Sequence, residues 1–307
     1  MIADSIIEEI GDTPLVRLND FYDGDNDVEL AAKLELFNPI SIKDRPVLSI
    51  IEEGERKGEI DEDTTIIEAT SGNTGMALSY ICAIKGYDLV ICMNEEMSEE
   101  RKGILRAFGA DLELTPPEEH TWAAKKRAMA LADEIDNSFY VNQHGNPANT
   151  RAHVETTAEE IWEDTDGDVD IVVAALGTTG TAMGLSKALK AKNPDIQVIG
   201  VEPEKAPKLS NGSWDPHDIP GTSPGFVPDL YEEGRVDEII QIDGEEEAYD
   251  ACQQIAKTEG MLVGISSGAT AAAAKQVADR EENDGKLVVS IFADSGQRYL
   301  SVEDLFF

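Results

Sequence analysis

Short apolar runs alternate with longer amphipathic segments along most of the chain. The runs are rich in Val and Ile, as in buried strands, and the segments between them have the length and apolar spacing that predict helices. Predicted helices end immediately before Gly58, Gly86 and Gly109, a residue type that is common at helix C-termini. This alternation predicts parallel sheets covered by helices, and therefore an α/β fold class.

The predicted elements fall into two successive sets. We predict a turn and strand within 11–18 and strands at 28–36, 65–69, 88–93, 111–114, 139–141, 170–176, 196–202, 236–242 and 286–292. We predict helices at 5–10, 45–57, 74–85, 98–108, 118–135, 148–163, 182–192, 244–259 and 267–278. The longest irregular segment, 203–228, is rich in Pro, Gly and Ser, and loops of that length are usually functional.

A chain of 307 residues suits two lobes rather than one core. The alternation of strands and helices starts again near residue 145, so we predict an N-terminal lobe at 1–145 and a C-terminal lobe at 146–307. Residues 13–36 are a candidate segment to cross over and pack with the C-terminal lobe. We expect each lobe to be doubly wound, with helices on both faces of its sheet.

The charge of the chain is strongly negative, and it is spread through the sequence. There are 62 acidic and 25 basic residues, which give a net charge of −37. Nucleic acids and anionic membranes bind through Lys and Arg, so neither is expected as a partner. Such a charge is typical of proteins from a halophilic cytoplasm, where molar salt screens the repulsion within the chain.

The N-terminus and the apolar runs predict a soluble, cytoplasmic protein. No run approaches the ~20 apolar residues that span a bilayer, and the first residues lack a basic segment followed by an apolar one. Cys82, Cys92 and Cys252 lie in apolar segments without paired spacing, as expected for buried reduced thiols. The four histidines show no metal-binding spacing, so no metal is expected.

Four loops contain residue types that are common in binding and catalytic sites, such as Lys, Ser, Thr, Asn and Gly. Each lies beside a predicted strand or helix. They are Asn38–Pro46, with Lys43 at its centre, Thr70–Gly75, Gly177–Thr181 and Gly264–Gly268. In open α/β sheets, active sites lie at the carboxyl ends of strands, which is where we place these loops. A single lysine between a strand and a helix is more often a solvated surface residue. The other three loops favour a functional role for Lys43.

The loop Gly177–Thr181 has the composition of a phosphate cradle. Its two glycines let main-chain amides approach an anion, its threonines add hydroxyl donors, and the following helix adds its positive N-terminus. A tight strand-to-helix turn would have a similar sequence. The loop Thr70–Gly75 has dense hydroxyls and amides that suit a small carboxylate, although Ser71 or Asn73 could simply cap a helix. Ser266 could likewise be only an N-cap.

Together, these residues meet the needs of pyridoxal phosphate: a lysine for a Schiff base, a phosphate cradle, an amide near the ring oxygen and a partner for the ring nitrogen. In their order, the motifs resemble the fold-type II (tryptophan synthase β-like) pyridoxal-phosphate enzymes, and within them the cysteine synthases of the O-acetylserine sulfhydrylase group. The resemblance runs from Gly11–Leu15 to Asp294–Ser301. It implies an active site in the cleft between the two lobes.

The resemblance also implies a role for each residue. Lys43 would form the Schiff base and act as the catalytic base, Asn73 would bond the ring 3′-oxygen, and Ser266 would face the ring nitrogen. The phosphate would be held by Gly177, Thr178, Thr179, Gly180 and Thr181. The substrate carboxylate would be bound by Thr70, Ser71, Gly72, Asn73, Thr74 and Gln143.

The implied reaction replaces the acetate of O-acetyl-L-serine with sulfide, through an aminoacrylate, and gives L-cysteine. Thr179 and the pairing of Glu68–Gly75 with Met97–Arg101 look like the cysteine synthase B branch, whose members often also accept thiosulfate. The segment 219–228 lacks the arginine of relatives that use O-phosphoserine. Cystathionine β-synthase, O-phosphoserine sulfhydrylase, serine or threonine dehydratase and a non-catalytic paralogue remain as alternatives. The resemblance further implies a homodimer and small-molecule partners only.

Overall fold

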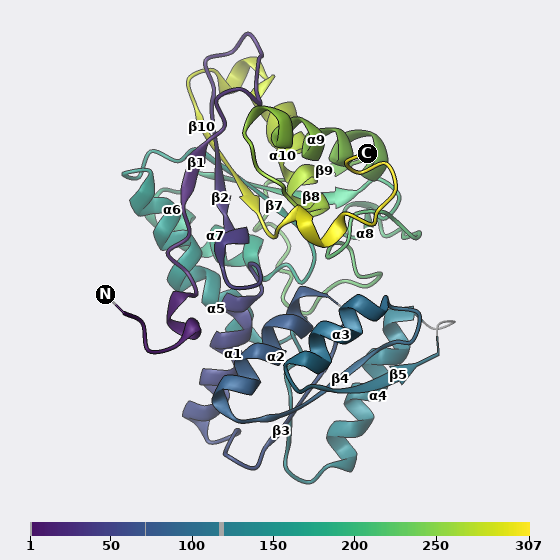
Figure 1. Ribbon diagram of the computed structural model, residues 1–307. Helices are drawn as coiled ribbons and strands as arrows, with labels where there is room; N and C mark the ends of the chain where they lie inside the picture. The colour runs from purple at the N-terminus through teal and green to yellow at the C-terminus, as the bar shows by residue number, and fades with distance from the viewer. Residues whose placement is uncertain (1, 71, 117–119) are drawn as a thin grey trace. The chain divides into compact units, whose positions relative to one another are not determined.

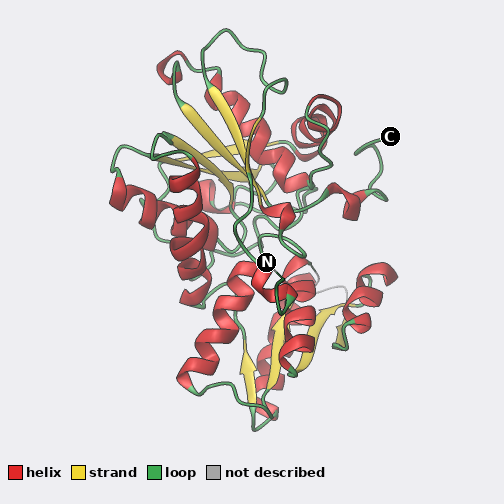
Figure 2. Cartoon of the chain, turned by 60° about the vertical axis from the view of Figure 1, so that its left-hand side comes forward, coloured by secondary structure: helices red, strands yellow, loops and turns green. Residues whose placement is uncertain are grey.

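The computed structural model describes residues 2–70, 72–116 and 120–307, which form two compact units. The first unit contains Lys43–Asn149 and the residues up to Glu8, and the second contains Glu9–Ile42 and Thr150–Phe307. The candidate crossover segment, 13–36, lies within Glu9–Ile42. Figure 1 labels most of the strands and helices of each unit, and Figure 2 colours them by type.

The second unit is built on a mostly parallel sheet. Its strands are β1 (Leu15–Arg17), β2 (Glu29–Leu34), β7 (Ile171–Ala175), β8 (Gln197–Pro203), β9 (Glu238–Ile242) and β10 (Leu287–Phe292). They are arranged in the order β1-β2-β10-β7-β8-β9. β1 runs antiparallel to β2, and all other neighbours are parallel. The sheet therefore joins strands from both ends of the chain.

Helices cover both faces of this sheet. The helices after residue 146 are α5 (Pro147–Ala152), α6 (Ala158–Asp164), α7 (Gly180–Lys192), α8 (Lys208–Asn211), α9 (Tyr249–Thr258) and α10 (Ile265–Ala278). Ile171 and Val173 of β7 belong to the apolar cluster that includes α9 and α10. Val172 and Ala174 belong to the cluster that includes α6 and α7. Because side chains alternate along a strand, the two clusters lie on opposite faces.

The first unit has a parallel sheet of its own. Its strands are β3 (Thr65–Ala69), β4 (Asp88–Asn94), β5 (Asp111–Thr115) and β6 (Ser138–Tyr140), in the order β5-β4-β3-β6. Its helices are α1 (Asp44–Lys57), α2 (Asn73–Lys85), α3 (Glu99–Ala107) and α4 (His120–Glu134). Ile67 and Cys92 pack against Ala124 of α4, whereas the equally buried Ile66 faces the opposite side. Burial on both faces explains the continuous apolar runs of β3 and β4.

Two predicted helices contain a wider turn that the sequence pattern does not reveal. A π-helical turn at His153–Thr157 separates α5 from α6 within the predicted helix 148–163. A second π-helical turn, Gly244–Ala248, precedes α9 within the predicted helix 244–259. Apolar spacing over a single turn is too short to distinguish the two kinds of helix, so both segments were predicted as uniformly helical.

Other predicted boundaries also need correction. α10 begins at Ile265 rather than at 267, and Gly264 is its N-cap. The strand predicted at 28–36 ends at Leu34, and a 3-10 turn follows at Glu35–Phe37. The irregular segment 203–228 contains the short helix α8. Further 3-10 turns lie at Ile6–Glu9, where a helix was predicted, and at Glu281–Asn283 and Gly296–Tyr299.

Cys82, Cys92 and Cys252 are buried free thiols, as predicted, and burial raises the pKa of each to about 12. Such thiols are poor nucleophiles near neutral pH. Within the described residues, no helix combines the length and the apolar character required to cross a membrane.

Candidate active site

Lys43 lies where the chain passes from the second unit to the first. It is the N-cap of α1, and its side chain is partly buried. The preceding residue, Ile42, belongs to the second unit and donates its N–H to the carbonyl of Ala293 at 2.9 Å. The following residue, Asp44, is buried and close to Tyr80 of α2, whose pKa is raised by burial and by the Asp44 charge. Both neighbours of Lys43 are therefore held in place.

The predicted carboxylate residues of the first unit lie at the carboxyl ends of two adjacent strands. Thr70, Gly72, Asn73 and Thr74 follow β3, and Gln143 follows β6, which is parallel to β3. The Thr74 hydroxyl donates to Oε1 of Gln143 at 2.8 Å. The fold thus brings together two residues that are 69 positions apart in the sequence.

The start of α2 tests whether Asn73 only caps a helix. Gly72 is the N-cap of α2, and Asn73 is its first residue, so capping by Asn73 is wrong. Ser71, named for both roles, lies outside the described residues. The first amides of a helix have no acceptor within the helix, and the positive end of the helix favours an anion there. With the hydroxyls of Thr70 and Thr74 nearby, this terminus has the groups that bind a small carboxylate.

His144 directly follows Gln143, and the charge of Lys43 in the same unit affects its pKa. Burial, together with the positive charges of Lys125 and Lys43, lowers the pKa of His144 to about 4. His144 is therefore neutral near neutral pH and adds no positive charge next to Lys43. The sequence analysis did not single out His144, and its position directly after Gln143 was the available signal.

The loop Gly177–Thr181 forms the turn between β7 and α7. Thr179 is the N-cap of α7 and has a left-handed backbone with φ of 66°, and Thr178 Oγ1 accepts the Gly180 N–H at 3.4 Å. The Thr179 hydroxyl is buried and has no hydrogen-bond partner among the described residues. A β-carbon on Gly177 would lie only 2.0 Å from the carbonyl oxygen of Gly221, so only glycine fits there. The loop is therefore tight, and it contains a donor that needs an acceptor.

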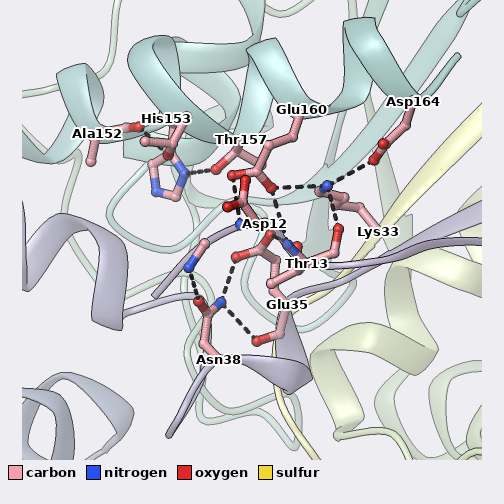
Figure 3. Close-up of polar contacts among 12 residues, drawn as sticks. Asp12, Thr13, Lys33, Glu35, Asn38, Ala152, His153, Thr157, Glu160 and Asp164 are labelled. Carbon is pink, nitrogen blue, oxygen red and sulfur yellow. Dashed lines mark hydrogen bonds and ion pairs between the residues drawn. The ribbon is translucent and has the colours of Figure 1, made fainter. Parts of the chain in front are cut away.

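His153 supports this loop from the π-helical turn. Its Nε2 lies 3.2 Å from Thr181 Oγ1, and its Nδ1 lies 2.9 Å from Thr157 Oγ1. Figure 3 shows the imidazole of His153 beside Thr157, with Glu160 one turn further along. The ring is buried, and its β-carbon is close to the position of Gly184 in α7. Sequence reasoning missed this residue because the contact with Thr181 spans 28 positions.

Ser266 lies in the first turn of α10, and it does not cap this helix, because Gly264 does. The alternative role as an N-cap is therefore wrong. The start of α10 is fixed to the end of β10 by the Ser267 hydroxyl, which accepts the Ala293 N–H at 2.9 Å. β10 and β7 are parallel neighbours, so Ser266 and the loop Gly177–Thr181 lie at the same edge of the sheet.

The predicted site residues thus form two sets, one in each unit. The first set contains Lys43, Thr70, Gly72, Asn73, Thr74 and Gln143, and the second contains Gly177, Thr178, Thr179, Gly180, Thr181 and Ser266. Within the described residues, no group of His, Cys, Asp and Glu side chains is arranged to hold a metal ion. The two sets contain an amine, the start of a helix with nearby hydroxyls, a turn rich in Gly and Thr, and the hydroxyl of Ser266.

The family model described as "Pyridoxal-phosphate dependent enzyme" matches residues 6–294. The chain belongs to this family. The predicted resemblance and the α/β fold class are confirmed, and the cofactor of the enzyme is pyridoxal phosphate.

Individual members of the family are similar over nearly the whole chain. A cysteine synthase of Staphylococcus aureus is 43% identical over 301 residues, which cover 97% of this chain and 96% of that protein. The crystal structure of O-acetylserine sulfhydrylase isoform 3 from Entamoeba histolytica has 42% identity and a TM-score of 0.96, covering 100% of this chain and 92% of that one. An O-acetylserine-dependent cystathionine β-synthase from Helicobacter pylori has 37% identity and a TM-score of 0.92, covering 98% of each chain.

The residues of this pyridoxal-phosphate dependent enzyme fit the parts of the cofactor. A phosphate needs several donors at close range. The turn before α7 provides helix amides and the buried hydroxyl of Thr179, which has no hydrogen-bond partner within the described ranges. The cofactor aldehyde needs a primary amine, which Lys43 would supply. A pyridine nitrogen needs a partner, for which the Ser266 hydroxyl is suited.

Proposed function

We propose that this enzyme is a cysteine synthase that converts O-acetyl-L-serine and sulfide into L-cysteine and acetate. The observation that carries this proposal is the near-full-length similarity to a cysteine synthase and to an O-acetylserine sulfhydrylase. The presence of Lys43, together with the contact between Thr74 and Gln143, supports a catalytic protein rather than a non-catalytic paralogue. Its partners are then small molecules: an amino-acid substrate and a sulfur donor.

Lys43 has two tasks in this proposal. Its Nζ would hold the cofactor covalently between turnovers, and during turnover it would remove the proton from the substrate α-carbon. When bound, pyridoxal phosphate withdraws electrons and makes that proton acidic enough to leave. Lys43 returns the proton to the same carbon after sulfide has taken the place of acetate at the β-carbon.

The remaining residues bind and orient. The hydroxyls of Thr70 and Thr74, the first amides of α2 and the Gln143 side chain hold the substrate carboxylate, so that the α-carbon is presented to Lys43 in one orientation. Asn73 would bind the ring oxygen of the cofactor, and Gly177–Thr181 would hold its phosphate. The Ser266 hydroxyl bonds the ring nitrogen without forcing its protonation as a carboxylate would, which favours β-replacement over transamination.

The identity of the two substrates is the finer part of the proposal. Segment 219–228 contains no arginine, which favours an acetyl over a phosphate leaving group. Thr179 in the phosphate loop favours the B branch and thiosulfate as an additional sulfur donor. The similarity to an O-acetylserine-dependent cystathionine β-synthase makes homocysteine the second candidate for the sulfur donor. Dehydration of serine or threonine is a less favoured alternative.

We also propose the setting in which the enzyme works. Its three cysteines are buried free thiols, which supports a reducing compartment and therefore the cytoplasm. Its net charge of −37 supports a high-salt environment. A homodimer is proposed from the resemblance alone, and sedimentation equilibrium at high salt would give the mass of the assembly.

A donor assay tests the function. Purified enzyme loaded with pyridoxal phosphate is given O-acetyl-L-serine or O-phospho-L-serine, each with sulfide, thiosulfate or homocysteine, and the amino-acid products are identified. We expect L-cysteine to form fastest from O-acetyl-L-serine and sulfide, and we expect Lys43→Ala to lose the activity and the absorbance of the lysine-bound cofactor. Faster formation of cystathionine would favour the second candidate, and release of a keto acid without sulfur incorporation would favour a dehydratase.

A further inference from the structure

Glu68 is a buried carboxylate at the carboxyl end of β3, and the predicted chemistry does not use it. Its side chain is only 1% exposed. Oε1 accepts the N–H of Ala69 at 2.7 Å, and Oε2 accepts the N–H of Gln143 at 3.0 Å. One carboxylate therefore bonds the main chain at the ends of β3 and β6, two strands that are parallel neighbours.

The main chain that Glu68 contacts carries the residues assigned to the substrate carboxylate. Ala69 directly precedes Thr70, and the side chain of Gln143 accepts the Thr74 hydroxyl at 2.8 Å. The Gln143 carbonyl is also fixed, because Asn149 Nδ2 donates to it at 2.7 Å. The N–H of Gln143 is thus the point at which Glu68 can control the position of the Gln143 side chain.

We propose that Glu68 is a positioning residue that holds Thr70, Thr74 and Gln143 in the arrangement that binds the substrate carboxylate. This proposal deepens the proposed function and rests on it. A carboxylate suits the task because both of its oxygens are acceptors, so that it can bond two main-chain N–H groups at once. A glutamine has only one acceptor oxygen, and its NH₂ group would face the second N–H.

The charge of Glu68 gives the contact a pH dependence. Burial raises the pKa of Glu68 to about 7, although the N–H groups of Gln143 and Ala69 and the charge of Lys125 counteract this. The other titratable groups around it are Tyr140 of β6 and Cys92 of β4; burial raises the pKa of both, so both are neutral near pH 7. Above its pKa, Glu68 accepts both N–H groups, and below it the added proton occupies one acceptor.

The experiment compares Glu68→Gln with the matched variant Glu202→Gln. Glu202 is also 1% exposed and accepts two main-chain N–H groups, from Leu209 at 2.7 Å and from Ser210 at 3.1 Å, but it lies in the second unit. L-serine is titrated into each holoenzyme, and its dissociation constant is obtained from the absorbance of the bound cofactor. Amide hydrogen exchange at Asn142, Gln143 and Thr74 is measured on the same proteins without any ligand.

We expect Glu68→Gln to weaken L-serine binding by between about tenfold and a hundredfold at about pH 8.5, because small displacements of binding groups have effects of this size. The ratio of its dissociation constant to that of the wild type should shrink towards one at about pH 5.5, where the wild-type carboxylate is protonated. This ratio removes the effect of other groups, because they titrate in the same way in the wild type and in Glu68→Gln. Glu68→Asp, which keeps the charge, should restore part of the affinity, and Glu202→Gln should match the wild type.

Equal L-serine affinity in the wild type and Glu68→Gln at about pH 8.5, or a ratio that does not change with pH, would overturn the proposal. Amide exchange decides the same question without the cofactor: we expect the Gln143 amide to lose protection in Glu68→Gln, and unchanged protection would also overturn the proposal. If Glu68→Gln does not fold, wild-type exchange replaces it, and the Gln143 amide should lose protection below about pH 7 while that of Ser210 does not. A wild-type protein that stays colourless with pyridoxal phosphate would contradict the proposed function instead.

Discussion

Lys33 Nζ lies 2.9 Å from Oε2 of Glu160, although the Lys33 side chain has no exposed surface. The same ammonium donates to the Thr13 carbonyl at 2.6 Å and pairs with Asp164 at 3.1 Å (Figure 3). Glu160 in turn accepts the N–H groups of Asp12 and Thr13. A buried ammonium requires this compensation, because the interior solvates a charge poorly. The cluster fixes the segment before β1 against α6.

We therefore expect Glu160→Ala to lower the free energy of unfolding by about 3–5 kcal/mol, because it leaves a buried lysine with one carboxylate fewer and two N–H groups without an acceptor. Lys33→Met should have a smaller effect, about 1–2 kcal/mol, because Glu160 keeps its two N–H donors. Denaturant unfolding at constant salt measures both. Glu159→Ala is the control. Glu159 lies on the same helix as Glu160, but it pairs with Lys192 of α7 at the surface. A change above about 1 kcal/mol in the control, or none in Glu160→Ala, would contradict this account.

Because Glu68 is buried, the free energy of unfolding should decrease as the pH rises. Its pKa is raised from 4.5 to about 7 in the folded protein, so the folded state binds the proton more tightly than the unfolded chain. The resulting stabilisation is complete below about pH 4.5 and is lost as the pH rises through about 7. Since one pKa unit corresponds to about 1.4 kcal/mol, the loss is about 3 kcal/mol.

This loss should disappear in Glu68→Gln, which is measured by unfolding both proteins across this pH range. Glu238→Gln provides a control of opposite sign. Its hydrogen bond with Arg280 lowers the pKa of Glu238, so the stabilisation by this pair is present above about pH 4.5 and is lost as the pH falls below that value. Parallel pH curves for the wild type and Glu68→Gln would show that Glu68 is not the group that titrates.

Glycines and apolar runs made most of the fold predictable. Gly58 and Gly86 have φ values of 72° and 83° at the ends of α1 and α2, as expected for residues that stop a helix in the left-handed region. The strands were predictable because burial on both faces requires continuous apolar runs. The loops that carry Lys43, Thr70 and Gly177 were therefore placed correctly beside their strands.

The supporting residues were not predictable, because their partners are remote in the sequence. Glu68 interrupts an apolar strand, but nothing in the sequence indicates that it bonds the main chain of Gln143, 75 positions later. His153 was noted only as one of four scattered histidines, since its contact with Thr181 depends on the π-helical turn at 153–157. The N-cap role considered for Ser266 failed because α10 starts two residues earlier than predicted, with Gly264 as its N-cap.

Stability should rise with salt, because acidic residues outnumber basic ones, 62 to 25. The Debye length falls from about 10 Å at 0.1 M to about 3 Å at 1 M salt, which screens repulsion between exposed carboxylates more than it weakens close ion pairs. We expect the thermal midpoint to increase with KCl up to molar concentration. Substituting Gln for the exposed Glu62, Glu96 and Glu233 should shift this curve to lower salt. A midpoint that is highest in dilute buffer would exclude adaptation to salt.

The hydroxyl of Thr179 should affect the stability of the cofactor-free protein and the affinity for the cofactor in opposite directions. In the described part of the chain it is buried without a hydrogen-bond partner, which is unfavourable by about 1–3 kcal/mol. Thr179→Val keeps the shape and the β-branch and removes the hydroxyl, so the cofactor-free protein should become equally or more stable. If this hydroxyl donates to the cofactor phosphate, the affinity for pyridoxal phosphate should fall by about 10- to 150-fold, as for a hydrogen bond to a charged group.

Two measurements separate these effects. Thermal unfolding gives the stability of the cofactor-free protein, and the absorbance of the bound cofactor, followed as pyridoxal phosphate is added, gives the affinity. Thr157→Val is the matched control, because it removes a hydroxyl that already has a partner, His153 Nδ1 at 2.9 Å. The control should lose stability in the cofactor-free protein, since it leaves the buried imidazole without that bond. A Thr179→Val protein that binds the cofactor as tightly as the wild type would show that the Thr179 hydroxyl does not hold the phosphate.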